Sequence, residues 1–131
     1  MSKSLIQVVD PFTQAVAVDG EIALGSVVRR FGCNLKLSGN SVVATGEGYY
    51  MIDAAVTVEP TATGAVTVGL FSNGTALPGV LSSSYGTASE PVTLPLVGTI
   101  RNVNCAENSL TLVLLNGAGN VTNVSMRVEK A

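Results

Sequence analysis

The chain has 131 residues, of which 47% are hydrophobic and 12% are charged, and its net charge is −2. This composition excludes a disordered chain, which needs low hydrophobicity and high charge. It also provides no electrostatic attraction to nucleic acid or to anionic membranes. The absence of histidine excludes Ser-His-Asp and Cys-His catalysis and removes the commonest metal ligand.

Apolar and polar residues alternate along most of the chain, a pattern that is typical of half-buried strands. In chain order, the expected strands are at residues 6–9, 15–18, 22–30, 34–37, 41–44, 48–58, 65–72, 76–82, 91–97, 109–116 and 121–129. Asn73 and Gly74 lie between two alternating runs and predict a two-residue hairpin turn, because both residues accept a positive φ. Short strands at this spacing, with no convincing helix, predict an all-β sandwich or barrel.

Several strands indicate which of their faces is buried. The inward rows are predicted to be Tyr50, Ile52, Ala54, Val56 and Val58, then Leu110, Leu112 and Leu114, and finally Val124, Met126 and Val128. The row opposite Tyr50 holds Tyr49, Met51 and Asp53, which is too apolar for open water and yet carries a charge. We therefore interpret it as a row that faces another subunit. The segment before Arg29 has no strong row, so we expect it to lie against a sheet edge or a neighbour.

The chain has no apolar stretch long enough for a transmembrane helix, and its start does not match a secretory signal peptide. We therefore expect a protein that is made in the cytoplasm and does not insert into membranes. So few charges on a small domain indicate that much of its surface is covered, most simply by copies of itself.

The sequence resembles a group of small jelly-roll proteins from Gram-positive gut bacteria and their phages and prophages. The resemblance extends from about Gln14 to the end of the chain. The residues that carry it are 28–33 (VRRFGC), 37–40 (LSGN), 48–52 (GYYMI), 66–70 (VTVGL), 73–74 (NG) with 77–79 (LPG), 109–114 (SLTLVL) and 121–125 (VTNVS). These proteins are similar to the TNF-like and complement globular-head superfamily.

The resemblance implies a ten-stranded TNF-like jelly-roll β-sandwich that forms a homotrimer. On this basis residues 20–131 form the jelly-roll domain, and residues 1–19 form an arm that docks onto a particle or a neighbour. The strand at 48–58 and the last strand are then neighbours in the inner sheet, and their outward rows meet the adjoining subunits. The candidate interface residues are Tyr49, Met51, Asp53, Ser125 and Arg127.

The function that the resemblance implies is non-enzymatic. The leading hypothesis is a phage virion structural protein, exposed on the particle surface as a head decoration, head-fibre or adsorption protein. Its partners are then capsid or other virion proteins and a host cell-surface glycan or receptor. The alternative hypothesis is a bacterial cell-surface or spore-surface adhesin or glycan-binding module, against which the missing export signal argues.

Two pairs of residues invite a specific role. Cys33 and Cys105 predict either a disulfide or two reduced thiols, and reduced thiols are the commoner state in a protein made in the cytoplasm. Asp53 and Arg127 predict either an ion pair that fixes register near a trimer interface or two unrelated solvated charges.

Other candidate sites are weaker. Tyr49, Tyr50, Phe71 and Tyr85 suggest a sugar-stacking platform, although core and interface positions are the commoner use of aromatic residues. The small-residue segment at 82–89 is expected to be an exposed loop, with Ser83, Ser84 and Tyr85 as a contact surface or a plain connector. The carboxylates are scattered, so no metal ion or cofactor is expected, and an axial cation held by three copies of Asp53 has only one residue in its favour.

Overall fold

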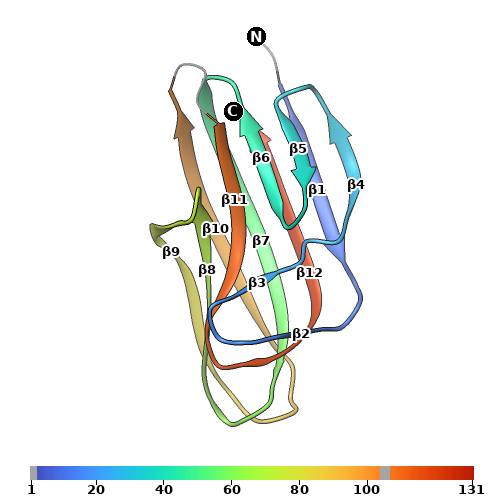
Figure 1. Cartoon of the computed structure of the whole chain (residues 1–131), viewed down its shortest axis with the longest axis vertical. Coiled ribbons are helices and arrows are strands. Elements are labelled where there is room, and N and C mark those ends of the chain that lie inside the picture. Colours follow the sequence, from blue (N-terminus) through green and yellow to red (C-terminus); the bar gives the residue numbers. More distant parts are fainter. Residues whose placement is uncertain (1–2, 104–106) are drawn as a thin grey trace.

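The computed structural model describes residues 3–103 and 107–131, and its regular elements are twelve strands. Figure 1 shows an elongated sandwich with both chain termini at the same end. The strands are β1 (Leu5–Asp10), β2 (Gln14–Val16), β3 (Gly20–Ile22), β4 (Ser26–Phe31), β5 (Leu35–Ser38), β6 (Ser41–Thr45), β7 (Gly48–Pro60), β8 (Gly64–Ser72), β9 (Thr75–Gly86), β10 (Val92–Asn102), β11 (Glu107–Asn116) and β12 (Gly119–Lys130).

The strands form two antiparallel sheets that pack face to face. Sheet A has the order β10-β7-β12-β1-β4, and β2 also pairs with β12. Sheet B has the order β5-β6-β11-β8-β9, and β3 also pairs with β11. From β10 onward each strand lies in the opposite sheet from the one before it, so the two sheets are joined by crossings at the ends of the sandwich. No described residue belongs to a helix that could cross a membrane.

The core lies between the sheets, and the three predicted inward rows are confirmed. Tyr50, Ile52, Val56 and Val58 on β7 are almost completely buried, and so are the corresponding residues of β11 and β12. Because successive side chains of a strand point to opposite faces, one buried row leaves the other row outside. Each fully buried Val, Leu or Ile contributes about 1.5–3 kcal/mol relative to an exposed one.

The ten strands that the resemblance implies are too few for the described residues, and the eleven strands expected from alternation become twelve because one of them is divided. The expected strand at 22–30 is interrupted, and Gly25 adopts φ +75° between β3 and β4. The Gln14 side chain occupies the interruption. Its Oε1 accepts from Ala23 N at 2.8 Å, and its Nε2 donates to Ala23 O at 2.9 Å. A side-chain amide here replaces a strand partner, which alternation in the sequence does not reveal.

The expectation that the chain before Arg29 lies against a sheet edge is also wrong for residues 5–10. This segment is β1, which lies inside sheet A between β12 and β4. Ile6 and Val8 are fully buried and pair with Val128 and Met126 of β12. Two inward residues are enough because they extend a core row that β12 already forms. A boundary between residues 19 and 20 therefore divides strands that share one sheet.

The predicted hairpin at Asn73–Gly74 is confirmed. These residues adopt φ 51° and 81° and connect the paired residues Ser72 and Thr75. After this turn the register of β9 against β8 shifts, and β9 approaches β10. Gly98 permits the approach, because a Cβ there would lie 2.9 Å from Val80 Cγ2.

Candidate interface on the outer face of sheet A

The outer face of sheet A is built from rows of side chains that continue from strand to strand. The pairing registers place one row across all five strands: Val97, Asp53, Arg127, Gln7 and Arg29. The adjacent row toward the chain termini is Thr99, Met51, Glu129, Leu5 and Phe31. The face therefore brings together residues from the beginning, middle and end of the sequence.

Asp53 and Arg127 form an ion pair at the centre of this face. Arg127 Nη2 lies 2.6 Å from Asp53 Oδ2, and the two residues are direct partners across β7 and β12. Of the two alternatives that the sequence left open for these residues, the structure therefore shows the ion pair. The side chains are 54% and 49% exposed, so water screens the pair in the single chain. Pairs of this kind contribute about 0–1 kcal/mol.

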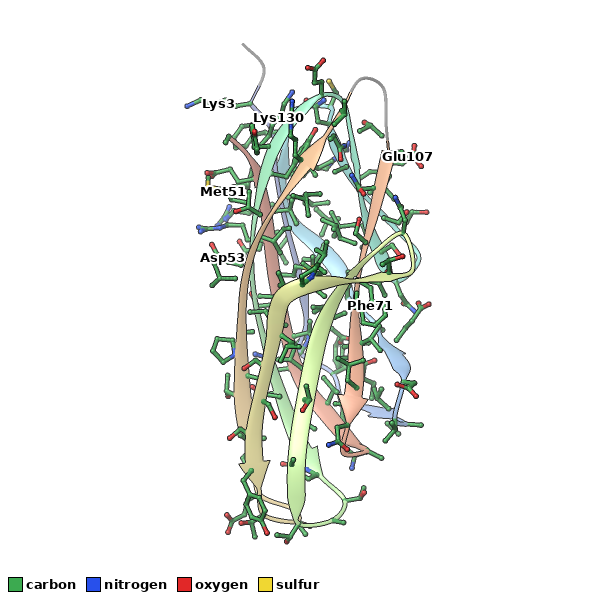
Figure 2. The ribbon with its side chains drawn as sticks, turned by 90° about the vertical axis from the view of Figure 1, so that its left-hand side faces the viewer. Lys3, Met51, Asp53, Phe71, Glu107 and Lys130 are labelled. Atoms are coloured by element: carbon green, nitrogen blue, oxygen red, sulfur yellow. The ribbon has the colours of Figure 1, made fainter. Side chains whose placement is uncertain are left out.

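Large apolar side chains on the same face as the ion pair remain exposed, and two of them, Met51 and Val97, line a depression beside it. The exposed fractions are 54% for Tyr49, 44% for Met51, 73% for Val97 and 55% for Phe31. The guanidinium carbon of Arg101 lies 5.6 Å from the centroid of the Tyr49 ring, within cation–π range. Figure 2 shows Met51 and Asp53 projecting from the same side of the sandwich. Aromatic residues, Met and Arg are the types enriched in protein–protein interfaces.

Two shallow depressions flank the ion pair. One is lined by Gln7, Asp53, Ala54, Ala55, Ser125 and Arg127. The other is lined by Met51, Ile52, Asp53, Val97, Gly98, Thr99, Arg127 and Glu129. Small side chains such as Ala55 and Ser125 line the first depression, whereas the larger Met51 and Val97 line the second. A protein surface of complementary shape can fit these depressions. They are too open to enclose a small molecule.

The structure brings the five candidate interface residues together on this one face. Tyr49, Met51 and Asp53 lie on β7, and Ser125 and Arg127 lie on the adjacent β12. Sequence reasoning missed Val97 and Arg101 on β10 and Gln7 on β1, the two strands that flank this pair. It also missed Phe31 on β4, the edge strand beyond β1. No local pattern could have found them, because strand order is set by contacts between distant segments. The role of the face in trimer formation stays a prediction.

The expected loop at Ser83, Ser84 and Tyr85 is instead part of strand β9. These residues pair with β8, and Thr67 Oγ1 lies 2.9 Å from Ser83 Oγ. Serine and glycine obscured the strand because they favour turns. Tyr85 is nevertheless 74% exposed on sheet B, so a contact role for this segment stays a prediction.

The aromatic residues do not form one platform. Tyr50 is buried, and its hydroxyl donates to Thr45 O at 2.7 Å, with Gly46 O at 3.1 Å as a second acceptor. Burial raises the pKa of Tyr50, and the charge of the Cys33 thiolate raises it further. Tyr49 and Tyr85 lie on different sheets, so a sugar cannot stack on both.

The remaining predicted sites gain little from the structure. Cys33 is exposed, and Cys105 lies outside the described residues, so their pairing stays a prediction. Within residues 3–103 and 107–131, no three His, Cys, Asp or Glu side chains gather as metal ligands do.

Charge is divided along the long axis of the molecule, which the sequence did not indicate. The strand registers of sheet A show how far along β7 each charged residue lies. Every basic residue paired in register with β7 lies level with Asp53 or nearer to the termini. Glu59 lies on the other side of Asp53, and so does Asp10, which is level with Val56 because both pair with Val124. The registers of sheet B show the same division along β11. Lys36 and Ser109 both pair with Val43, so Lys36 is level with the start of β11. Glu21 pairs with Val113, farther from the termini. Figure 2 shows Lys3, Lys130 and Glu107 near one end of the molecule. Among the residues that the structure describes, the half with the termini thus holds the basic side chains, and the charged side chains of the other half are all acidic: Asp10, Asp19, Glu21, Glu59 and Glu90.

Comparison with known proteins identifies the fold. No protein-family model matches the chain, and no curated protein sequence matches it. Murine APRIL at pH 5.0 is similar in structure, with a TM-score of 0.78 and 14% identity over 98% of this chain and 99% of that chain. The globular domain of zebrafish complement 1qA protein has a TM-score of 0.71 and 8% identity over 94% of each chain. The PRD1 vertex protein P5 has a TM-score of 0.65 and 12% identity, over 97% of this chain and 96% of that chain. Together with the two antiparallel sheets, these similarities show a TNF-like jelly-roll sandwich.

Proposed function

We propose that this chain is a non-enzymatic, trimeric surface protein that belongs to a phage virion. In this proposal it lies exposed on the particle as a head decoration, head-fibre or adsorption protein. The single observation that carries the trimer is the outer face of sheet A, where exposed apolar side chains share one surface with an ion pair. The similarity in fold to a vertex protein supports the placement on a particle.

The proposed mechanism is burial of this face against neighbouring copies around a three-fold axis. Monomeric proteins rarely expose large apolar patches, so the face is the surface most in need of a partner. Burying the Asp53–Arg127 pair removes water that screens it, and a charged pair in that position favours one register over others. Three linked copies then multiply weak contacts to a ligand through their effective concentration.

We place the three-fold axis along the long axes of the copies. The copies then point the same way, so the trimer has one end rich in basic residues and one acidic end. The proposed docking segment remains residues 1–19, part of which also forms β1. Within it, Phe12 is 77% exposed and its backbone is fixed by a hydrogen bond from Phe12 N to Asp10 Oδ1 at 3.0 Å. An exposed aromatic side chain on a backbone fixed in this way is a good anchor, because little backbone freedom is lost on binding.

The trimer is tested by light scattering of the purified full-length chain. The expected mass is three times that of the chain, and Met51→Glu is expected to lower it to that of one chain. Tyr85→Glu is the matched control, since it places the same charge on an exposed residue of sheet B. A single chain that stays monomeric at high concentration contradicts the proposal.

The virion role is tested separately by mass spectrometry of purified phage particles and by antibody labelling of those particles. We expect the protein in intact particles, and Phe12→Ser is expected to reduce its attachment while leaving the trimer intact. Particles that form and infect normally without the protein bound to them contradict the virion role and leave the trimer untouched.

The exposed Tyr85 beside the hydroxyl row of Ser83 and Thr67 favours a second candidate, a glycan-binding surface protein. An aromatic ring next to hydroxyl groups suits a sugar, which presents apolar and polar faces. Binding of the trimer to a glycan array, lost in Tyr85→Ala, together with absence from virions, would favour this candidate.

A further inference from the structure

The chain contains two Asn-Gly pairs, and both lie in turns. Asn73–Gly74 connects β8 to β9, and Asn116–Gly117 begins the connection from β11 to β12. In such a pair the backbone nitrogen of glycine is not shielded by a Cβ, so it can attack the asparagine side-chain amide. The reaction requires the asparagine Cγ to swing toward that nitrogen. How each side chain is held therefore decides whether the pair reacts in the folded protein.

Asn73 is held on both sides of its carboxamide. Its Nδ2 donates to Glu107 O and to Asn108 Oδ1, each at 3.2 Å, and its Oδ1 accepts from Ser109 N at 2.9 Å. The backbone nitrogen of Asn73 also donates to Ser109 O at 2.9 Å. Attack on Cγ would need all three side-chain hydrogen bonds to break. The fold therefore keeps this side chain away from Gly74.

The side chain of Asn116 lacks the hydrogen bonds that hold the side chain of Asn73. It is the last residue of β11 and is exposed, and no side-chain hydrogen bond anchors it to another part of the chain that the structure describes. Its neighbour Gly117 adopts φ +76°, a conformation that departs from the strand. The carboxamide of Asn116 can therefore rotate freely in water, whereas that of Asn73 cannot.

We propose that Asn116 is a deamidation site of the folded protein and that Asn73 is protected by the fold. The Gly117 nitrogen loses its proton to hydroxide and bonds to Asn116 Cγ. The bond from Cγ to Nδ2 breaks, Nδ2 takes a proton from the water just formed and leaves as ammonia, hydroxide is regenerated, and a succinimide ring remains. Water then adds to one of the two ring carbonyls and opens the ring to aspartate or isoaspartate. Nothing is oxidised or reduced.

The two products differ in their effect on the fold. Either product adds a negative charge to the half of the molecule in which the described charged side chains are all acidic. Isoaspartate also adds a backbone atom to the turn between β11 and β12. Gly119, which follows this turn, is tightly packed, because a Cβ there would lie 2.6 Å from Glu59 O. The backbone at Gly119 therefore has no room to shift for the extra atom, and isoaspartate should destabilise the packing of β12 at this end of the sandwich.

The test is incubation of the full-length folded chain at mildly alkaline pH, followed by tryptic peptide mapping with fragment-ion mass spectrometry. Arg101 places the two pairs on different tryptic peptides. We expect the replacement of NH₂ by OH at Asn116 to be about tenfold faster, or more, than at Asn73, because three hydrogen bonds must break at Asn73. In concentrated urea both pairs are expected to react at similar rates.

Two variants sharpen the test. Asn116→Gln should abolish the modification at residue 116, because the longer side chain forms the ring poorly. Asn108→Ala removes one acceptor of Asn73 and should accelerate reaction at Asn73 in the folded chain. If Asn108→Ala does not fold, the comparison of folded protein with urea still decides. Equal rates at the two pairs in the folded wild-type chain, or a faster rate at Asn73, would overturn the proposal.

Discussion

Arg127 on β12 and Asp53 on β7 are direct cross-strand partners, and Nη2 of the arginine lies 2.6 Å from Oδ2 of the aspartate. The pair sits between two shallow depressions on the outer face of sheet A. Both side chains are about half exposed in the single chain, so the pair contributes little there. The contribution of the ion pair to stability therefore depends on whether another protein surface covers it.

The first prediction separates these two situations. Asp53→Asn should change the free energy of unfolding of the single chain by no more than about 1 kcal/mol, because the pair is exposed. In the proposed trimer the same change leaves Arg127 buried and unpaired, so trimer dissociation should shift to clearly lower denaturant concentration. The double exchange of Asp53→Arg with Arg127→Asp should recover part of the loss. Equal dissociation of wild type and Asp53→Asn would refute a buried role.

The second prediction concerns β1. Ile6→Ala should lower the free energy of unfolding by about 2–5 kcal/mol, because it leaves a cavity beside Val128 in a fully buried row. Leu5→Ala is the control, since Leu5 lies on the outer face and is only half buried. Urea unfolding monitored by circular dichroism measures both. Similar losses for the two variants would mean that β1 does not contribute to the core.

The third prediction concerns a close backbone approach. Gly25 adopts φ +75°, and a Cβ there would lie 2.3 Å from Val9 O and 2.7 Å from Asp10 Cβ. Gly25→Ala should therefore prevent β4 from docking normally beside β1 and should destabilise strongly. Gly39→Ala is the control, because φ is +59° and nothing lies within 4 Å. It should cost only about 1–2 kcal/mol, the penalty of a left-handed residue, in the same unfolding measurement.

The fourth prediction concerns pH. Burial raises the pKa of Tyr50 in the folded chain, so the folded state retains a proton that the unfolded state loses above about pH 10. This stabilisation is complete at lower pH and disappears as the pH rises through the folded-state pKa. Tyr50→Phe should cost about 0.5–1.5 kcal/mol at neutral pH through the lost hydrogen bond to Thr45 O.

The difference in unfolding free energy between wild type and Tyr50→Phe should then shrink as the pH rises above about 10. Parallel unfolding curves at several alkaline pH values provide the measurement. A difference that stays constant across this range would show that Tyr50 ionises equally well in the folded and unfolded states.

Some of the fold could be predicted from local pattern. The alternation at Tyr50, Ile52 and Ala54 identified the inward face of β7, because residues two apart share a face. Asn73 and Gly74 predicted the hairpin, because both tolerate positive φ. The outward positions of Tyr49, Met51 and Asp53 followed from the same alternation.

Other features could not be predicted because they depend on partners far along the chain. β1 has only two inward residues, and its place in sheet A depends on β12, more than a hundred residues later. The segment at Ser83 to Tyr85 has turn-forming residues, yet pairing with β8 makes it a strand. The role of Gln14 could not be predicted either, because its side chain forms hydrogen bonds to the backbone of Ala23 in place of a strand partner.

The sequence by itself determined that the chain folds as strands, which side of the main strands is buried, and that no histidine chemistry is available. The tertiary structure alone decided which strands are neighbours, and therefore which outward residues share a face and how charge divides between the two ends. The physical reason is that side-chain alternation is a property of neighbouring residues, whereas strand order depends on which distant segments together bury the most apolar surface.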